Sequence, residues 1–408
     1  MHAFDTRQLA SIARQYGAPL WVYHADTIRE RIAELKAFDT IRYAQKANSN
    51  THILRLMREQ GVKVDAVSLG EIERALAAGY LGGEQADIVF TADLLDRPTL
   101  AKVVAERIPV NAGSIDMLRQ LGEAAPGHPV WLRINPGFGH GHSQKTNTGG
   151  ENSKHGIWHG ELAEALAAVR RHGLRLVGVH MHIGSGVDYG HLERVCGAMV
   201  DTVAALGCDL EAISAGGGLS VPYRDGDARI DTGHYFQLWD AARRRIADRL
   251  GHPVRLEIEP GRFLVAEAGA LLAEVRAVKD MGRRHFVLVD AGFNDLMRPS
   301  LYGSYHHITL LDADGAGKTG RIDTVVAGPL CESGDVFTQR EGGTVETRPL
   351  PPARIGDLMV FHNAGAYGAT MSSNYNSRPL LAEVLVDGAE VRQIRRRQTM
   401  AELLALEA

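Results

Sequence analysis

Cysteines, blocks of like charge and long apolar runs are all scarce in this sequence, and each scarcity excludes a class of protein. Only three cysteines occur in 408 residues, and none stands in a C-x-x-C spacing, which excludes a disulfide scaffold and a thiolate zinc site. No apolar run approaches the roughly 18 residues that cross a bilayer. No basic block is longer than Arg395-Arg396-Arg397 and the net charge is −4, so nucleic-acid binding is not expected. We therefore expect a cytoplasmic enzyme without a signal peptide that acts on small molecules.

Glycine is the residue type in surplus. The chain has 45 glycines among 408 residues, whereas a usual level of about 7% would give roughly 29. The length fits one large barrel plus a second domain, or two to three ordinary domains. With 45% apolar and 23% charged residues, the composition is that of a globular protein. The glycines are therefore the first places to look for function.

From residue 41 onward, short β-branched runs alternate with helical stretches. The strand-like runs are 41–44, 62–67, 87–90, 109–112, 129–134, 175–181, 210–215 and 254–258. Amphipathic segments at 52–59, 70–79, 161–172, 191–206 and 235–249 fill the intervals. This alternation predicts an α/β fold, a (β/α)8 TIM-type barrel with its active site at the carboxyl ends of the strands. A doubly wound open sheet has the same periodicity and stays open as the alternative.

Beyond residue 265 the pattern changes. Runs at 285–290, 322–327, 357–362, 381–386 and 391–395 lack long helical spacers, which predicts a C-terminal all-β domain. Residues 19–24 (PLWVYH) form one more strand before the barrel pattern starts. We expect this strand to join the β domain. The predicted organisation is thus residues 1–24 with the β domain, 25–264 as the barrel and 265–408 as the β domain.

A lysine and two glycine-rich turns stand at predicted strand ends. Lys46 follows the first barrel strand in YAQKANSN, Gly216–Gly218 follow the seventh, and Gly261-Arg262 follow the eighth. Barrels commonly bind phosphate after strands seven and eight, where backbone N–H groups approach the anion. A desolvated lysine attacks carbonyl groups. This combination suggests a Schiff base to pyridoxal phosphate, whose ring nitrogen needs an acid such as Glu259.

His180 and His182 allow two interpretations. Two residues apart in a strand, their side chains face the same way. They could form an H-x-H metal pair, which with His140 and His142 would make a metal-dependent barrel hydrolase. Alternatively, an imidazole lies flat on a cofactor ring. The hydrolase leaves Lys46 and the glycine triplet without a role.

The β domain contributes two motifs with reactive side chains. CESGDVF at 331–337 holds a single thiol, Cys331, beside Glu332, and NAGAYG at 363–368 holds a single phenol. A small thiol at a strand end is usually packing, but beside Glu332 it is a candidate proton donor. Arg298 and Tyr302, four residues apart, suit either the surface or ligand binding.

These motifs together resemble the fold-type III pyridoxal-phosphate decarboxylases. YAQKANSN, HIGSG at 182–186, GGGL at 216–219, EPGR at 259–262, CESGD at 331–335 and NAGAYG follow the order of that family along nearly the whole chain. The stretches at 137–157 (GFGHGHSQKTNTGGENSKHGI) and 371–379 (MSSNYNSRP) resemble its enterobacterial diaminopimelate decarboxylase branch. The resemblance implies an alanine-racemase-like fold and pyridoxal 5′-phosphate as cofactor.

The resemblance also implies roles for individual residues. Lys46 binds the cofactor covalently, His182 stacks on the ring, and Glu259 pairs with the pyridinium nitrogen. The phosphate and its surroundings are held by Ser185, Gly218, Gly261, Arg262 and Tyr367. Members of the family are homodimers with shared active sites. Cys331 and Glu332 would therefore come from the partner subunit, with Cys331 as the catalytic proton donor after CO2 leaves.

Charge decides between substrates. Meso-2,6-diaminopimelate keeps an intact amino-acid end, so its pocket needs a cation for the distal carboxylate and an anion for the distal ammonium. The candidates are Arg262, Arg298, Tyr302 and Tyr367 for the carboxylate and Glu332 for the ammonium. An arginine fork suits a carboxylate because two parallel hydrogen bonds fix its orientation. This set favours the last step of lysine biosynthesis, giving L-lysine and CO2, over an ornithine or arginine decarboxylase. The resemblance implies reaction at the D-configured centre.

Overall fold

The computed structural model describes residues 4–139, 149–182 and 188–408, which form two compact units. One, here called the barrel unit, comprises Arg31–Ser220 and Ala228–Phe263. The other, here called the β unit, comprises Met1–Glu30, Val221–Asp227 and Leu264–Ala408. The β unit is therefore assembled from both ends of the chain and one short internal segment. The domain boundaries that the sequence indicates at residues 24 and 264 stay a prediction.

The barrel unit contains a closed parallel sheet. Its strands are β2 (Thr40–Ala44), β3 (Lys63–Ala66), β4 (Ile88–Ala92), β5 (Val110–Ala112), β6 (Pro129–Asn135), β8 (Arg175–His180), β9 (Ala212–Ser214) and β10 (Arg255–Ile258). Each pairs in parallel with the next, and β10 returns to β2, so the ring closes. The short β7 (Ile157–Trp158) pairs with β6 outside the ring. The predicted (β/α)8 barrel is confirmed, and the pairing of β10 with β2 excludes the open sheet.

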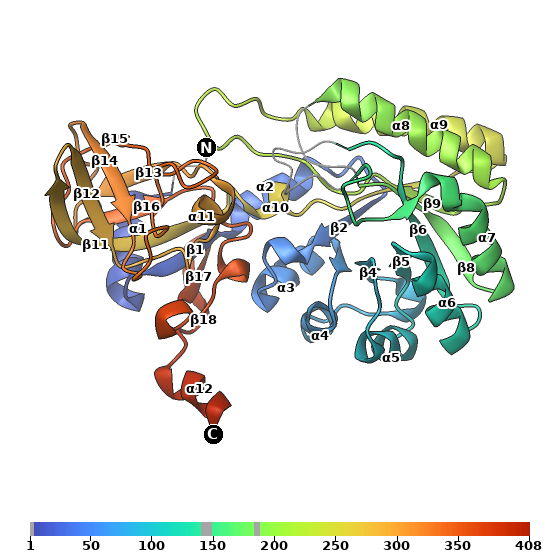
Figure 1. Cartoon of the computed structure of the whole chain (residues 1–408), viewed down its shortest axis with the longest axis horizontal. Helices are drawn as coiled ribbons and strands as arrows, with labels where there is room; N and C mark the ends of the chain where they lie inside the picture. Colours follow the sequence, from blue (N-terminus) through green and yellow to red (C-terminus); the bar gives the residue numbers. More distant parts are fainter. Residues whose placement is uncertain (1–3, 140–148, 183–187) are drawn as a thin grey trace. The chain divides into compact units, whose positions relative to one another are not determined.

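Helices connect these strands around the outside of the ring (Figure 1). They are α3 (Thr51–Glu59), α4 (Leu69–Ala77), α5 (Arg97–Ala105), α6 (Ile115–Ala124), α7 (Leu162–Arg171), α8 (Tyr189–Leu206) and α9 (Thr232–Leu250), with α10 (Arg262–Val265) after β10. Side-chain caps begin several of them: the Ser68 hydroxyl accepts from the Glu71 N–H, and the Ser114 hydroxyl accepts from the Met117 N–H. These caps fix where each loop at the carboxyl end of the strands gives way to a helix.

In the β unit, the N-terminal strand lies inside the sheet. β1 (Leu20–His24) pairs antiparallel with β11 (Gly269–Met281) on one side and parallel with β17 (Ala382–Asp387) on the other. The remaining strands are β12 (Arg284–Val289), β13 (Ile308–Leu311), β14 (Ile322–Ala327), β15 (Arg348–Leu350), β16 (Leu358–Phe361) and β18 (Glu390–Arg395). The expectation that residues 19–24 join the C-terminal domain is confirmed.

The longest strand, β11, is one that the sequence does not indicate. Its segment GALLAEVRAVKDM contains three Ala, two Leu and one each of Glu, Arg, Lys and Met, all of which favour helices. Pairing with β1, β12 and β16 overrides that local preference, because the strand satisfies its backbone groups on both edges. Tertiary pairing, not local propensity, therefore determines this element.

The core of the β unit packs α1 (Thr6–Tyr16) against the sheet. Buried Leu9 and Ile12 of α1 form one cluster with Leu20 of β1, Leu272 of β11 and Val384 of β17. Burying an aliphatic side chain of this size contributes about 1.5–3 kcal/mol. The cluster therefore joins the two ends of the chain through apolar contacts.

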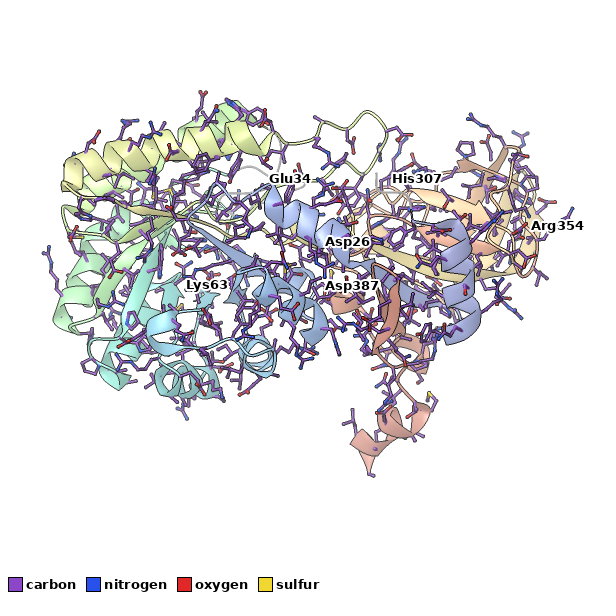
Figure 2. All side chains as sticks on the ribbon, turned by 180° about the vertical axis from the view of Figure 1, so that it is seen from behind. Asp26, Glu34, Lys63, His307, Arg354 and Asp387 are labelled. Atoms are coloured by element: carbon purple, nitrogen blue, oxygen red, sulfur yellow. The ribbon has the colours of Figure 1, made fainter. Side chains whose placement is uncertain are left out.

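An ion pair fixes the start of α2 (Ala25–Ala33) to the same sheet. Arg29 Nη1 lies 2.7 Å from Oδ1 of Asp26 and 2.7 Å from Oδ1 of Asp387, two carboxylates labelled in Figure 2. Two short helices, α11 (Arg298–Tyr302) and α12 (Met400–Leu404), complete the unit. Across the parts of the chain that the structure describes, no helix combines the length and apolar character needed to cross a membrane.

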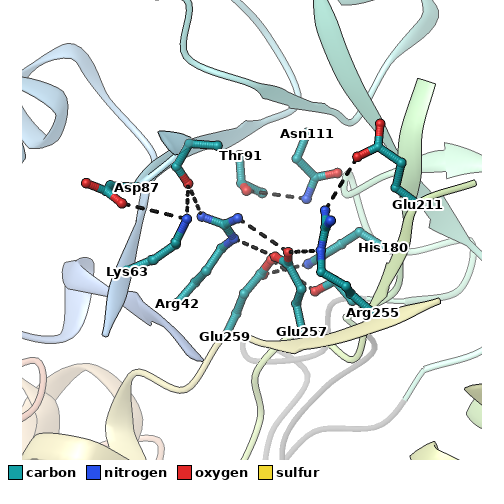
Figure 3. A network of polar contacts seen from close by, with 12 residues as sticks. Arg42, Lys63, Asp87, Thr91, Asn111, His180, Glu211, Arg255, Glu257 and Glu259 are labelled. Atoms are coloured by element: carbon teal, nitrogen blue, oxygen red, sulfur yellow. Dashed lines mark hydrogen bonds and ion pairs between the residues drawn. The ribbon is translucent and has the colours of Figure 1, made fainter. Parts of the chain in front are cut away.

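In the barrel unit, a buried ion pair joins the first and last strands of the ring. Arg42 Nε on β2 lies 2.6 Å from Oε2 of Glu257 on β10, as Figure 3 shows. Arg42 Nη1 also donates to the carbonyl of Ala86 at 2.8 Å. Removing one partner of a buried pair typically costs about 3–5 kcal/mol because the other charge stays buried. This pair therefore fixes the closure of the barrel within the strands, whereas the residues that follow those strands form the candidate site.

Candidate functional site

At the carboxyl ends of the barrel strands, Glu259 is bound by two polar side chains. Its Oε2 lies 2.7 Å from His180 Nε2 (Figure 3), and its Oε1 accepts from Ser214 Oγ at 3.1 Å. All three residues are buried. Burial raises the pKa of the Glu259 carboxyl, but His180, His182 and Ser214 outweigh it and lower the pKa below its usual value. Glu259 is therefore an ionised buried carboxylate, suited to stabilising a proton on a ring nitrogen.

Lys46 is exposed directly after β2. It lies in a single turn of 3-10 helix, Gln45–Ala47, whose flanking residues are buried. The charge of Lys46 acts on the carboxyl groups of Asp65 and Glu71, and lowers the pKa of each against the larger opposite effect of burial. Burial and the charge of Glu259 together raise the pKa of Asp65 well above its ordinary value. The amine thus stands among carboxyl groups at the ends of neighbouring strands.

Several buried polar atoms at the barrel strands have no hydrogen-bond partner among the described residues. They are both amide atoms of Gln45, Oδ1 of Asp65, Oδ1 of Asn111 and Nδ1 of His180. Asn111 Nδ2 donates to Thr91 Oγ1 at 3.3 Å, so only its oxygen is unsatisfied. Each such atom costs about 1–3 kcal/mol. A ligand with its own donors and acceptors would satisfy them, so these residues fit a polar cofactor.

His182 stands just past the end of β8 and is partly exposed. Its Nδ1 accepts a hydrogen bond from the Gly217 N–H at 3.0 Å. Burial of the ring, with the positive charges of Arg133 and Lys46, lowers the pKa of His182 well below its ordinary value. The ring is therefore neutral, with its proton on Nε2. The two histidines of the H-x-H pair have different partners, since His180 binds Glu259.

Glycines allow the loop after β9 to approach its neighbours closely. A Cβ at Gly217 would lie 2.5 Å from the carbonyl oxygen of Glu259, and one at Gly216 would lie 2.5 Å from that of Met181. Gly218 has φ of 99°, a conformation that other residues rarely adopt. The Gly216 N–H donates to Ser214 Oγ at 3.2 Å and the Gly217 N–H donates to His182 Nδ1 at 3.0 Å. Of the three glycines, Gly218 is therefore the candidate to offer its N–H to an anion, and the phosphate cradle stays a prediction.

Two arginines add positive charge at the strand ends of the barrel. Arg262 begins α10 directly after Gly261, where a Cβ would lie 3.1 Å from the Ala44 carbonyl oxygen. Arg133 on β6 is buried, and burial lowers its pKa while the carboxylates of Asp93, Glu259 and Asp65 raise it. The site prediction omits Arg133. Its signal in the sequence is a charged residue inside the apolar run VWLRI at a strand end.

In the β unit, α11 carries two of the predicted residues. Arg298 is 5% exposed, and its Nη1 donates to the Tyr223 hydroxyl at 3.2 Å and to His306 Nε2 at 3.1 Å. Tyr302 ends the same helix and is partly exposed. Tyr367 has φ of 57°, an uncommon left-handed backbone for a residue other than glycine. Arg298 is therefore an interior residue of this unit and not a surface cation.

Cys331 and Glu332 are exposed on a loop of the β unit. The carboxylate of Asp335 accepts from the Leu330 N–H at 2.7 Å and shapes the turn. The Cys331 N–H donates to Asn376 Oδ1 at 2.9 Å. The backbone of the thiol is thus fixed while its side chain stays accessible, which argues against a packing role for this cysteine.

Three candidate residues, Ser185, His140 and His142, lie outside the described residues. Within the described residues, no group of three or more His, Cys, Asp or Glu side chains is arranged to hold a metal ion. The histidine that the sequence offers as half of a metal pair, His180, binds a carboxylate instead.

Comparisons with known proteins agree with one another. Residues 25–266 match the family described as "Pyridoxal-dependent decarboxylase, pyridoxal binding domain". A diaminopimelate decarboxylase of Streptomyces coelicolor is 70% identical over 407 residues, which cover 99% of this chain and 92% of that protein. One from Escherichia coli K12 is 68% identical and covers 98% of this chain and 96% of its own.

Solved structures extend the comparison to the fold. A crystal structure of a diaminopimelate decarboxylase has a TM-score of 0.96 at 67% identity, covering 98% of this chain and 96% of that one. A diaminopimelate decarboxylase from Helicobacter pylori, complexed with L-lysine, has a TM-score of 0.84 at 31% identity, covering 98% and 99%. The likeness therefore includes both units.

Proposed function

Because this chain belongs to the pyridoxal-dependent decarboxylase family, we infer that it is a carbon–carbon lyase of amino-acid metabolism. It removes the carboxyl group at the D-centre of meso-2,6-diaminopimelate and gives L-lysine and CO2, the last step of lysine biosynthesis. The observation that carries this conclusion is 70% identity over nearly the full chain to a diaminopimelate decarboxylase. A second relative, at 68% identity, is also a diaminopimelate decarboxylase, which favours this substrate over ornithine or arginine.

The cofactor is pyridoxal 5′-phosphate, which when bound withdraws the electron pair that departing CO2 leaves on the substrate carbon. We propose that Lys46 holds its aldehyde group, because this exposed lysine follows Gln45, whose amide atoms are unsatisfied, and its charge acts on Asp65. Glu259 keeps a proton on the ring nitrogen, a role that an ionised buried carboxylate suits. His180 and Ser214 hold the Glu259 carboxylate in place through hydrogen bonds.

The remaining barrel residues hold the ring and its phosphate. His182 stacks on the ring as a neutral imidazole, so it adds no charge that would compete with the proton that Glu259 holds. Backbone N–H groups at Gly218 and Gly261, with the cation of Arg262, bind the phosphate. Ser185 and Tyr367 complete this set in the proposal.

The distal end of the substrate needs both signs of charge. We assign its carboxylate to Arg298, because a buried guanidinium binds a carboxylate strongly where water is excluded, and we propose Arg262, Tyr302 and Tyr367 as further ligands of the substrate. We assign its ammonium group to Glu332. A relative that produces a diamine would need only the anion, so Arg298 is the residue that distinguishes the two substrate classes.

We propose a homodimer whose two subunits share each active site. In this arrangement the partner subunit's Cys331 delivers a proton to the substrate carbon after CO2 leaves, and the partner subunit's Glu332 binds the distal ammonium. The exposure of both residues on a loop of the β unit supports their delivery to another chain. The free cysteines of the chain also support a reducing compartment, and we propose the cytoplasm.

CO2 release tests substrate and reaction class together. The protein is assayed in parallel with meso-diaminopimelate, LL-diaminopimelate, ornithine and arginine, with pyridoxal phosphate present. We expect release from the meso compound alone, because LL-diaminopimelate lacks a D-centre and the other two lack the distal carboxylate. Release from ornithine at a comparable kcat/KM would overturn the substrate assignment and leave the family unchanged. Sedimentation at assay concentrations tests the dimer.

A further inference from the structure

A buried network inside the β unit fixes the side chain of Arg298. Its Nη1 lies 3.2 Å from the Tyr223 hydroxyl and 3.1 Å from His306 Nε2. The Cζ atom of Arg298 stands 5.0 Å from the centre of the Tyr223 ring, and that ring meets His306 edge-on with centroids 5.6 Å apart. The guanidinium is therefore held by a ring and by two hydrogen bonds within its own unit.

The protonation of His306 follows from its two contacts. Nδ1 lies 3.0 Å from the carbonyl oxygen of His362, which only accepts, so Nδ1 carries the proton. Arg298 only donates, so Nε2 accepts with its lone pair. The neutral ring with its proton on Nδ1 is the form that satisfies both contacts. Because His306 is 4% exposed, water has little access to replace either bond.

Tyr223 reaches this network from an unexpected part of the sequence. It lies in Val221–Asp227, between β9 and α9, yet this segment belongs to the β unit. Asn363 Nδ2 donates to the carbonyl of Pro222 at 2.9 Å and anchors the segment next to Tyr223. The backbone of Asn363 has φ of 53°, in the left-handed region that residues other than glycine rarely adopt. The loop after a barrel strand thus supplies one wall of the Arg298 network.

We propose that His306 is a positioning residue for substrate specificity, whose neutral imidazole orients Arg298 to receive the distal carboxylate. The inference rests on the proposed role of Arg298. An arginine must lie in one plane to form two parallel hydrogen bonds to a carboxylate. A side chain that is already held loses less entropy when the ligand binds. His306 and Tyr223 supply that restraint without touching the substrate.

Two substitutions at His306 separate its two contacts. His306→Asn keeps a donor where Nδ1 stands, facing the His362 carbonyl, but places no acceptor at Arg298. His306→Gln does the reverse, because its amide oxygen reaches the position of Nε2. We expect Asn to raise KM for meso-diaminopimelate about tenfold with kcat within about twofold, and Gln to raise KM less than about threefold. D-lysine, which lacks the distal carboxylate, should be turned over equally by both variants and the parent.

His307→Asn is the matched control. Its ring is labelled in Figure 2 and faces that of His362, with centroids 5.6 Å apart. We expect its KM for meso-diaminopimelate to equal that of the parent. Thermal unfolding and the absorbance of the bound cofactor are recorded for every variant. Equal losses in the Asn and Gln variants, or equal losses on both substrates, would show that the ring serves packing alone and overturn the proposal.

Arg298→Ala distinguishes a failure of the positioning role of His306 from a failure of the proposed substrate-binding role of Arg298, on which it rests. If Arg298→Ala leaves the preference for meso-diaminopimelate over D-lysine unchanged, the substrate-binding role of Arg298 fails, and the positioning role of His306 fails with it. If Arg298→Ala removes that preference while His306→Asn preserves it, the positioning role alone is overturned. The proposal stands when Arg298→Ala and His306→Asn lower the preference and His306→Gln restores it.

Discussion

Unsatisfied polar atoms gather at the strands of the barrel unit, whereas Arg298 in the β unit is already bonded. In the barrel unit, Asp65, Asn111 and His180 have buried polar atoms with no partner among the described residues. In the β unit, Arg298 already has bonded partners in Tyr223 and His306. The barrel is thus prepared to receive a group that brings its own donors and acceptors. The β unit holds Arg298 in a fixed orientation in advance, which suits the selectivity that we propose for it.

This contrast predicts which property each substitution changes. A substitution at the barrel site should alter the absorbance of the bound cofactor, whereas one in the β unit should leave that absorbance intact and alter kinetics. Every variant is therefore measured both ways. A substitution in the β unit that abolishes the absorbance of the cofactor would contradict this contrast. A substitution at the barrel site that leaves the absorbance normal and changes only substrate selectivity would contradict it as well.

Lys46→Ala should have the largest effect. Without the amine, the absorbance of the covalently held cofactor disappears and kcat falls at least about a thousandfold, as when a residue that forms a bond in the reaction is removed. Absorbance spectra recorded before and after borohydride reduction measure the loss of the covalently held cofactor. The control is Lys36→Ala, an exposed lysine that donates to the Gln60 carbonyl at 3.2 Å, and it should match the parent. A covalent adduct at another lysine would contradict the assignment.

Glu259→Gln should lower kcat about a hundredfold while the cofactor stays bound. An amide cannot stabilise a proton on the ring nitrogen as a carboxylate does, so the electron pair is withdrawn less effectively. Glu257→Gln, on the strand β10 that directly precedes Glu259, is the matched control because its carboxylate pairs with Arg42. It should lower the free energy of unfolding and keep kcat. Equal kcat in the two variants would remove Glu259 from the mechanism.

Cys331→Ala should slow turnover about tenfold or more and leave cofactor absorbance unchanged, because it removes a proton donor and no cofactor contact. Cys208→Ala, a thiol on the barrel unit, serves as the control and should show parent kinetics. Mixing Cys331→Ala with Lys46→Ala tests the shared site as well. Activity recovered in the mixture indicates a dimer with one intact site, and its absence there would contradict sharing.

The smallest effect is a pH dependence of stability in the β unit. Burial raises the pKa of Asp295 to about 7 and that of Asp290 to about 6. A raised pKa means that the fold favours the protonated form, so this contribution is complete below about pH 4 and is lost as pH rises towards 7. The free energy of unfolding of Asp295→Asn, relative to that of the parent, should rise by on the order of 1–2 kcal/mol between pH 4.5 and 7.5. Urea unfolding of both proteins at the two pH values measures this change. The same difference in unfolding free energy at both pH values would contradict the raised pKa of Asp295.

Much of the fold is predictable from the sequence because strand and helix periods are local properties. The eight predicted runs of the barrel coincide with strands, and the glycine triplet stands where a close approach requires it. β11 is not predictable, since its residues favour a helix and only distant strands reverse that preference. Strand order and closure are likewise properties of pairing and cannot be inferred from spacing.

In the site, residue type and strand-end position suffice to indicate Lys46 and Glu259. Spacing alone does not separate His180 from His182, because the partner of each is a residue far along the chain, and only the family resemblance singles out His182. The network around Arg298 is hidden for the same reason, since Tyr223 lies 75 residues before it. A residue that acts through another side chain leaves no motif of its own.

The place of β1 has a consequence for synthesis on the ribosome. Tyr23 on β1 donates to Glu383 on β17 at 2.7 Å, across a separation of 360 residues. β1 is therefore synthesised first but cannot pair with β17 until nearly the whole chain has been made. The barrel strands between them in the sequence are synthesised much earlier. Contacts so distant in sequence form slowly, and an unpaired edge is prone to aggregation in the interval. A nascent chain of this protein thus emerges with a finished barrel and an N-terminal strand that still lacks its neighbour.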